Sequence, residues 1–126
     1  MVGEWEVLLV DEVVSWFEGL MKADWESACL VEQAIDALAA DGPSLGRPLV
    51  DRVHGSRLHN MKELRPGSAK ASEIRILFVF DSIRRAVLLV AGDKAGNWRS
   101  WYRENIPLAE KRYEAHMTEL NIREYL

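Results

Sequence analysis

Positively charged side chains gather in the middle of this chain, and they are the first residues whose types suggest chemistry. Residues 46–85 hold nine bases and four acids, whereas residues 1–45 hold ten acids and one base, Lys22. Residues 86–126 hold six of each sign. The net charge of -4 therefore hides a basic block that could attract a polyanion such as RNA. A solvated surface carrying several arginines would give the same count.

Arg75 is the most informative of these cations because it interrupts an apolar pattern. It lies between Ile74 and Ile76, where a charged side chain is costly unless it is paired or faces water. One interpretation is an ion pair with Glu63 or Glu73. The other is a phosphate clamp, because the planar guanidinium can bind two phosphate oxygens at once.

Other cations lie on or next to the strands expected around Arg75. Lys62 and Arg65 belong to the preceding strand, and Lys94 comes just after the following one. In a regular strand Lys62 and Arg65 point to opposite faces, so a twist or bulge is needed for both to join one site. Arg57, in the loop before them, is a further candidate for contact with RNA.

A segment that interleaves aromatic and basic residues, Asn97–Arg103, reads NWRSWYR. Bases stack on aromatic faces and arginines neutralise phosphates, so Trp98 and Arg99 are candidates for binding single-stranded RNA. The alternative is that Trp98 and Trp101, three residues apart, pack one helical turn onto the sheet. Tyr102 could act as a general acid or base if its pKa were lowered.

Several classes of site have no support in the residue pattern. The three histidines do not match a zinc-ligand spacing, no glycine-rich phosphate loop follows a strand, and the single cysteine, Cys29, excludes an internal disulfide. We therefore expect no metal and no cofactor. No apolar run approaches the roughly 20 residues that span a bilayer, and the first residues lack the bases of a signal peptide. The expected location is the cytoplasm, without membrane contact.

Hydrophobic periodicity predicts the elements that must position these side chains. Asp11 and Asp24 are expected to cap two successive helices, Gly42 to end the second one, and Pro107 to lie in the first turn of the last one. The expected strands are residues 4–10, about 60–65, 73–80 and 86–91, with a further short one near 49–53; the expected helices are residues 11–21, 25–40 and 107–120, and the tail 121–126 is of uncertain order.

The resulting order, β-α-α-β-β-β-α, predicts one domain over residues 1–126. Because two helices precede three consecutive strands, we expect an antiparallel sheet with the helices packed on one face. The other face would then carry the polar side chains of the basic block. Ile74, Ile76, Phe78 and Phe80 are expected to face one side of their strand, and Arg75, Leu77 and Val79 the other.

Four segments together resemble a known family. They read GRPLVDRVHGSRLHNMKELRPGS, EIRILFVFD, RRAVLLVAGDKAG and NIPLAEKRYEAH, and they run from about Leu45 to His116. In this order they resemble the RelE/HigB-like toxins of type II toxin–antitoxin systems, and most closely the Gp49-like branch. The resemblance implies a compact α+β domain of the RelE type, with two N-terminal helices on the sheet and a C-terminal helix.

The resemblance also implies an activity and its partners. Such toxins are metal-independent endoribonucleases that usually cut mRNA in the ribosomal A site and so inhibit translation and growth. The 2′-hydroxyl attacks the adjacent phosphate, leaving a 2′,3′-cyclic phosphate and a 5′-hydroxyl. The implied partner is a cognate helix-turn-helix antitoxin, and operator DNA would be reached only through it. The codon preference, the oligomeric state and the mode of neutralisation are not implied.

Some residues match the family's motifs one by one. Lys62 and Arg75 match its phosphate-binding cations, Lys94 matches a basic residue after the last strand, and Arg65 matches less well. His59, Lys94 and Tyr102 are the unranked candidates for the general acid and base.

The loop DKAGNWRSWYREN is longer and more aromatic than its counterpart in commoner members. An alternative is therefore a non-catalytic relative that binds its antitoxin and operator DNA or RNA. A phage-derived accessory protein without nuclease activity is a third.

Overall fold

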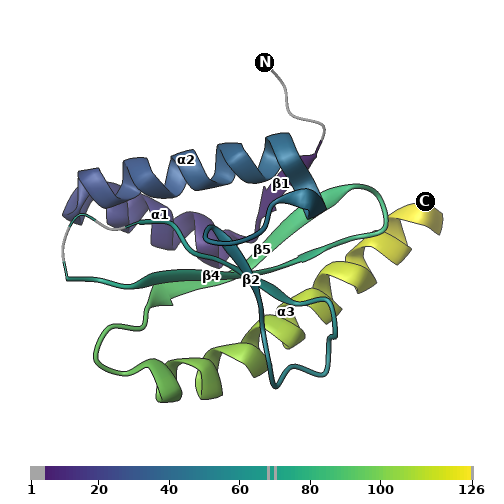
Figure 1. Ribbon diagram of the computed structural model, residues 1–126. Helices are drawn as coiled ribbons and strands as arrows, with labels where there is room; N and C mark the ends of the chain where they lie inside the picture. Colours follow the sequence, from purple (N-terminus) through teal and green to yellow (C-terminus); the bar gives the residue numbers. More distant parts are fainter. Residues whose placement is uncertain (1–4, 68, 70, 126) are drawn as a thin grey trace.

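The computed structural model describes residues 5–67, 69 and 71–125. Its elements form an α+β domain, which confirms the predicted fold class (Figure 1). In chain order they are β1 (Glu6–Leu9), α1 (Asp11–Ala23), α2 (Trp25–Asp41), the short 3₁₀ helix η1 (Gly42–Ser44), β2 (Val50–Arg52), β3 (Lys62–Leu64), β4 (Ile74–Phe80), β5 (Arg85–Asp93) and α3 (Trp98–Tyr125). None of the helices in the described part of the chain is long and apolar enough to cross a membrane.

The five strands form one sheet in the order β1-β5-β4-β3-β2. Neighbours among β2 to β5 are antiparallel, as expected, and the short strand near 49–53 is present as β2. However, β1 pairs with β5 in parallel, so the sheet is mixed rather than wholly antiparallel. The helical hairpin between β1 and the rest of the sheet supplies the long connection that a parallel pair requires.

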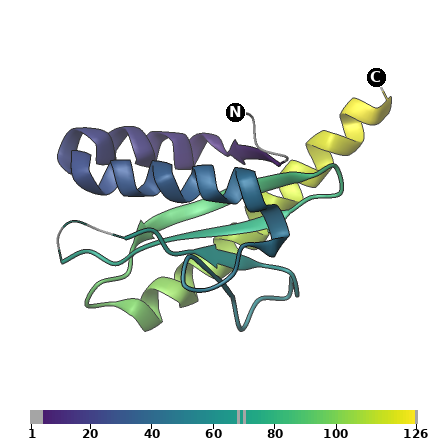
Figure 2. The same ribbon diagram turned by 45° about the horizontal axis from the view of Figure 1, so that its top comes forward.

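Helices cover both faces of this sheet, which corrects the expectation that they share one face (Figures 1 and 2). Side chains of α1 and α2, such as Val13 and Leu38, pack with Ile74, Ile76 and Phe78 on one face. Side chains of α3 pack on the other face, and the residues they bury include Leu77 and Val79. The alternation predicted for β4 is therefore confirmed, although α3 covers much of the face expected to be polar.

Helix α3 begins at Trp98 and contains Pro107 in its interior, whereas the sequence predicted a helix that starts near Pro107. The reason is the burial of Trp101, in the first turn of α3, against strand β5. Trp101 is 8% exposed and lies over Gly92 of β5, where a Cβ atom would come within 2.7 Å of the indole nitrogen. Burying an aromatic side chain of this size outweighs the missing N–H of a proline.

The ends of the first two helices test the predicted caps. Asp24 caps α2 as predicted, because its carboxylate accepts a hydrogen bond from the Ser27 backbone N–H at 3.2 Å. Gly42 ends α2 with a positive φ of 56°, also as predicted, and its bare Cα leaves room for the Trp5 ring. Asp11 is not a cap: it is the first residue of α1, where its charge still favours the helix dipole.

Candidate functional site

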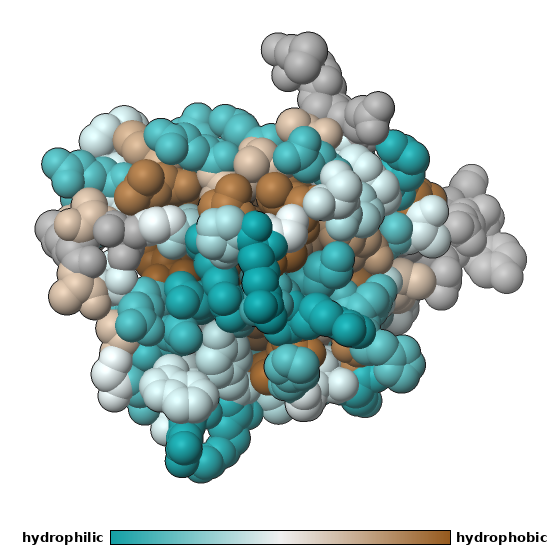
Figure 3. All heavy atoms as spheres, in the orientation of Figure 1, coloured by the Kyte–Doolittle hydropathy of each residue, from teal (hydrophilic) through white to brown (hydrophobic). Residues whose placement is uncertain are grey.

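A cleft of about 490 Å³ lies between the β2–β3 side of the sheet and the first turns of α3. We call it the cation cleft, because five of its ten lining residues are lysine or arginine and only one is acidic. The lining residues are Arg52, Val53, His54, Glu63, Arg65, Lys94, Trp98, Arg99, Tyr102 and Arg103. In the space-filling view, hydrophilic side chains cover the part of the molecule where β2 lies at the front (Figure 3).

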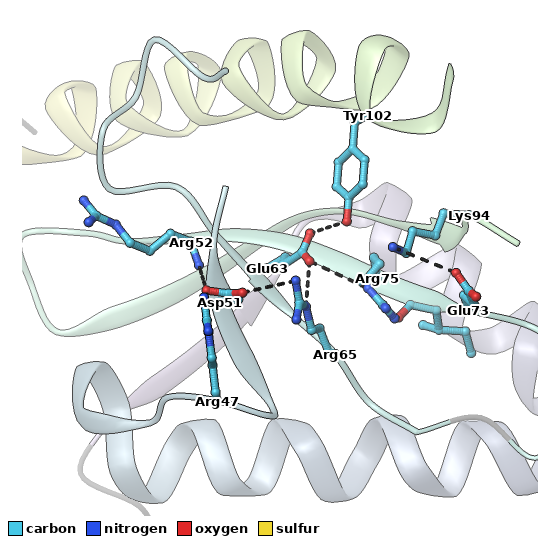
Figure 4. Close-up of polar contacts among 10 residues, drawn as sticks. Arg47, Asp51, Arg52, Glu63, Arg65, Glu73, Arg75, Lys94 and Tyr102 are labelled. Atoms are coloured by element: carbon cyan, nitrogen blue, oxygen red, sulfur yellow. Dashed lines mark hydrogen bonds and ion pairs between the residues drawn. The ribbon is translucent and has the colours of Figure 1, made fainter. Parts of the chain in front are cut away.

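Glu63, in the middle of β3, is the acid at the centre of this cleft. Its side chain is only 3% exposed. It accepts hydrogen bonds from Arg65 Nε at 2.7 Å and from the Tyr102 hydroxyl at 2.6 Å. Figure 4 shows Tyr102 pointing from α3 towards Glu63, and the side chains of Arg65 and Arg75 pointing towards the same carboxylate. A carboxylate buried this deeply requires such donors to offset its lost hydration.

Arg75 reaches the same carboxylate from β4. Its Nε lies 3.7 Å from Glu63 Oε1, so the ion-pair interpretation with Glu63 is correct, and Glu73 is not its partner. Another nitrogen of the guanidinium donates to the Ile74 backbone oxygen at 2.8 Å. This ion pair does not exclude a phosphate role, because a guanidinium carries five N–H donors.

Lys94 lies beside this group, at the end of β5. Its ammonium is 5.4 Å from the centre of the Tyr102 ring and 3.9 Å from a carboxylate oxygen of Glu73 (Figure 4). The cleft therefore brings together six residues of the predicted site. Arg65, Arg75, Lys94 and Tyr102 lie on or near its inner wall, and Trp98 and Arg99 lie at its rim.

The charges of the cleft shift the proton equilibria of two of its groups. Burial raises the pKa of Tyr102 well above its ordinary value of 10.0, and the hydrogen bond and charge of Glu63 raise it further. Burial lowers the pKa of Arg65, but Glu63 and Asp51 outweigh this effect and raise it overall. Tyr102 thus stays protonated and donates a hydrogen bond, contrary to the lowered pKa that a basic tyrosine would need.

The rim of the cleft is formed by the first turns of α3. Trp98 is 54% exposed, and the guanidinium of Arg99 lies 5.3 Å from the centre of its ring. The packing alternative for Trp98 and Trp101 therefore holds for only one of the two, because Trp101 is buried while Trp98 is open to solvent. Arg103 adds another exposed cation one turn later.

Three residues from the predicted site lie elsewhere. Lys62 pairs with Phe78 across the strands and lies 5.5 Å from the Phe80 ring, on the face that α1 and α2 cover. The pairing register of β3 is regular from Lys62 to Leu64, so Lys62 and Arg65 point to opposite faces. His59 is exposed in the turn before β3, and Arg57 forms ion pairs with Glu110 and Glu114 of α3.

Sequence reasoning missed four polar residues of the cleft as site candidates, Arg52, His54, Glu63 and Arg103, as well as the apolar Val53. Arg103 closes the NWRSWYR segment, and Arg52 lies in the basic block, so composition carried a signal for both. Glu63 was noticed only as a partner for Arg75. The choice of His54 over His59 depends on the path of the loop, which no periodicity reports. Among the described residues, no group of three or more His, Cys, Asp or Glu side chains could hold a metal ion.

The sequence is similar to one known protein family and to two named proteins. Residues 19–114 match the family described as "Phage derived protein Gp49-like". The chain belongs to the Gp49-like family. It is 51% identical over 108 residues to "Putative toxin HigB3" of Mycobacterium tuberculosis, covering 86% of this chain and 90% of that protein. It is 49% identical over 110 residues to "Putative toxin HigB2" of the same organism, covering 87% of this chain and 53% of that protein. No solved structure matches the chain significantly.

The Gp49-like match bears directly on the cation cleft. It contains all ten lining residues, from Arg52 to Arg103, together with Arg75. It does not include β1 or the first half of α1. The part of the chain that carries the candidate chemistry is thus the part that the Gp49-like family shares, and the resemblance to HigB-like toxins is confirmed.

Proposed function

We propose that this chain is the toxin of a type II toxin–antitoxin system and that it cuts mRNA as an endoribonuclease. The observation that carries the proposal is the cation cleft, which is lined by five cations, an exposed tryptophan and the buried carboxylate of Glu63. The cations can bind the phosphates of RNA, and the exposed indole ring can stack with an unpaired base. The names of the two mycobacterial relatives support the toxin role.

The reaction we propose is an attack by the RNA 2′-hydroxyl on the adjacent phosphorus. The O2′–P bond forms and the P–O5′ bond breaks, so a 2′,3′-cyclic phosphate and a 5′-hydroxyl result. The 2′-hydroxyl loses a proton and the leaving O5′ gains one. Arg65, Arg75 and Lys94 would neutralise the charge that builds up on the phosphate oxygens, which is usually the largest contribution in such a site.

The proton transfers restrict which residues can take part. Tyr102 keeps its proton, so it would donate a hydrogen bond rather than accept the 2′-hydroxyl proton. Neutral imidazole can accept a proton near neutral pH, and His54 is the histidine that lines the cleft. We therefore propose His54 as the proton acceptor, and Lys94 as the donor to the leaving oxygen. His59 remains the alternative that the resemblance suggested.

The proposed toxin function also implies a substrate and a protein partner. The substrate would be mRNA in the ribosomal A site, in the cytoplasm, where cleavage stops translation and growth. A toxin requires a neutralising protein, and we propose a cognate helix-turn-helix antitoxin that also brings the toxin to operator DNA. A neighbouring gene for such a protein would support this partner.

Expression in a bacterium with mapping of mRNA ends tests the proposal. The wild type should arrest growth and create new, defined ends, and Arg75→Ala should lower cleavage by about 10²–10³-fold, as expected for removal of one charge-stabilising donor. Growth arrest without new ends would favour the binding-module alternative. If neither the wild type nor Arg75→Ala arrested growth at equal soluble levels, the catalytic interpretation would be wrong.

A pair of lysine variants then separates the cleft from the opposite face of the sheet. Lys94→Ala removes a cation that lines the cleft, whereas Lys62→Ala removes one that lies over Phe80. We expect cleavage to fall strongly in the first variant and to change little in the second. The reverse result would move the site to the other face.

A further inference from the structure

Glu63 holds a position that simple neutralisation of the cleft does not require. The residue is 2% exposed and lies in β3 opposite Asp51 of β2 and Leu77 of β4. An acid placed on the exposed rim would lower the positive charge of the cleft at little cost in hydration. A carboxylate inside the sheet loses its hydration, and its partners must offset that loss.

The three partners that offset this cost, two hydrogen-bond donors and the ion-paired Arg75, come from three different parts of the fold. Arg65 follows β3, Arg75 lies in β4, and Tyr102 belongs to the second turn of α3 (Figure 4). Their contacts with the carboxylate measure 2.7, 3.7 and 2.6 Å. A single carboxylate thus fixes the relative positions of two guanidinium groups and one hydroxyl that are far apart in the sequence.

The arginines depend on Glu63 to different degrees. Arg65 has a second acid, Asp51, whose Oδ2 lies 3.2 Å from its terminal nitrogen. Arg75 has no second acid within ion-pair distance among the described residues. Its Nε is buried, and among those residues it finds no hydrogen-bond acceptor within normal range. Apart from its hydrogen bond to the adjacent Ile74 backbone oxygen at 2.8 Å, the Arg75 fork is therefore oriented by the charge of Glu63.

We propose that Glu63 is the positioning residue of the cleavage site: it holds the forks of Arg65 and Arg75 and the Tyr102 hydroxyl in the geometry that the reaction needs. This inference rests on the proposed ribonuclease function. Glu63 itself contacts no RNA and transfers no proton. It acts through the three groups that do meet the substrate.

Glu63→Gln separates positioning from electrostatic attraction. The amide keeps the size of the side chain but removes its charge, so the cleft gains one positive charge and should bind phosphates more tightly. The forks lose their anchor, and a displacement of about 1 Å at a reacting group can cost about 10²-fold in rate. We expect kcat to fall by about this factor while an uncleavable oligonucleotide, with 2′-deoxyribose at the scissile position, binds as tightly as before or tighter.

Asp51→Asn is the matched control. It removes the same charge from the neighbouring strand, but Asp51 contacts only Arg65 of the three groups. We expect tighter RNA binding in this variant as well, with kcat within a few-fold of the wild type. If both variants lowered kcat equally, the charge of the cleft rather than the position of Glu63 would explain the effect, and the proposal would be overturned.

A measurement without RNA keeps this proposal distinct from the proposed function. Glu63 raises the pKa of Tyr102 beyond the effect of burial, so Glu63→Gln should let the Tyr102 phenolate form at lower pH. Ultraviolet absorbance during an alkaline titration detects the phenolate, and Tyr102→Phe identifies its share of the signal. Wild-type protein that cleaves no RNA would refute the proposed function, whereas an unchanged titration in Glu63→Gln would refute the positioning role.

Glu63→Asp serves if the glutamine variant does not fold. The shorter carboxylate keeps the charge but cannot reach Arg65, Arg75 and Tyr102 together, so RNA binding should match the wild type while kcat falls. Full activity in a folded Glu63→Asp variant would show that the position of the carboxylate does not matter.

Discussion

Two buried carboxylates in this molecule, Glu63 and Asp81, have similar partners, but Glu63 lines a cleft and Asp81 lies in a closed turn. Glu63 contacts two arginines and Tyr102 of α3. Asp81, just past the other end of β4, accepts from Arg85 at 2.8 Å and lies 3.3 Å from His116 of α3. Each cluster therefore joins a buried acid in or next to the sheet, arginine and one polar side chain of α3.

The two carboxylates differ in where their partners come from and in whether those partners border a cleft. The second oxygen of Asp81 accepts from the backbone N–H groups of Ile83 and Arg85, at 3.0 Å each, and the side chain is fully buried. Its donors come mostly from its own turn, so the cluster closes the β4–β5 hairpin. The hydrogen-bond donors and the ion-pair partner of Glu63 come from different parts of the fold, at a cleft with a surplus of cations. Similar groups thus close a hairpin in one place and line an open cleft in the other.

The largest effect that would sharpen this comparison is on stability. Asp81→Ala leaves the half-buried Arg85 without its carboxylate, and we expect the free energy of unfolding to fall by about 3–5 kcal/mol. Urea unfolding followed by circular dichroism measures this change. RNA cleavage per folded molecule should stay near the wild-type value. A folded Asp81→Ala variant without activity would make the two clusters one functional unit.

A smaller effect tests the open side of the comparison. Trp98→Ala removes an exposed ring at the rim of the cleft, and binding of single-stranded RNA should weaken by about 1–3 kcal/mol, the usual contribution of one stacked base. Trp25→Ala is the matched control, because Trp25 is 64% exposed at the start of α2. Fluorescence anisotropy at one stated salt concentration measures both. An equal loss in the two variants would leave the cleft without a special role in binding.

The smallest effect concerns acid stability. Burial alone would raise the pKa of Asp81, but hydrogen bonds from Arg85, Ile83 and His116 hold it below its ordinary value of 3.8. A lowered pKa stabilises the fold above the ordinary value, and this contribution is lost as the pH falls through the folded-state value. The unfolding free energy should therefore decline below pH 3.8 more steeply in the wild type than in Asp81→Asn. Parallel curves would contradict this assignment.

Sequence reasoning succeeded where local pattern decides the structure. The alternation of β4 separated Arg75 from Ile74 and Ile76, and it also warned that Lys62 and Arg65 face opposite sides. Both inferences depend only on the two-residue period of a strand.

It failed where distant parts of the chain meet. The start of α3 depends on the fit of Trp101 against Gly92, and the choice of His54 over His59 depends on the path of a loop. The sequence offered Glu63 as one possible partner of Arg75, but no local pattern connects Glu63 with Tyr102 of α3, so only the folded chain reveals that contact.

Helix α3 supplies one polar side chain to each cluster: Tyr102 reaches Glu63 and His116 reaches Asp81. One inserted or deleted residue between them would turn one side chain about 100° around the helix relative to the other and shift it by about 1.5 Å. Both contacts could not then survive. Length changes among descendants of this chain should therefore accumulate in its loops, while the spacing between Tyr102 and His116 stays fixed.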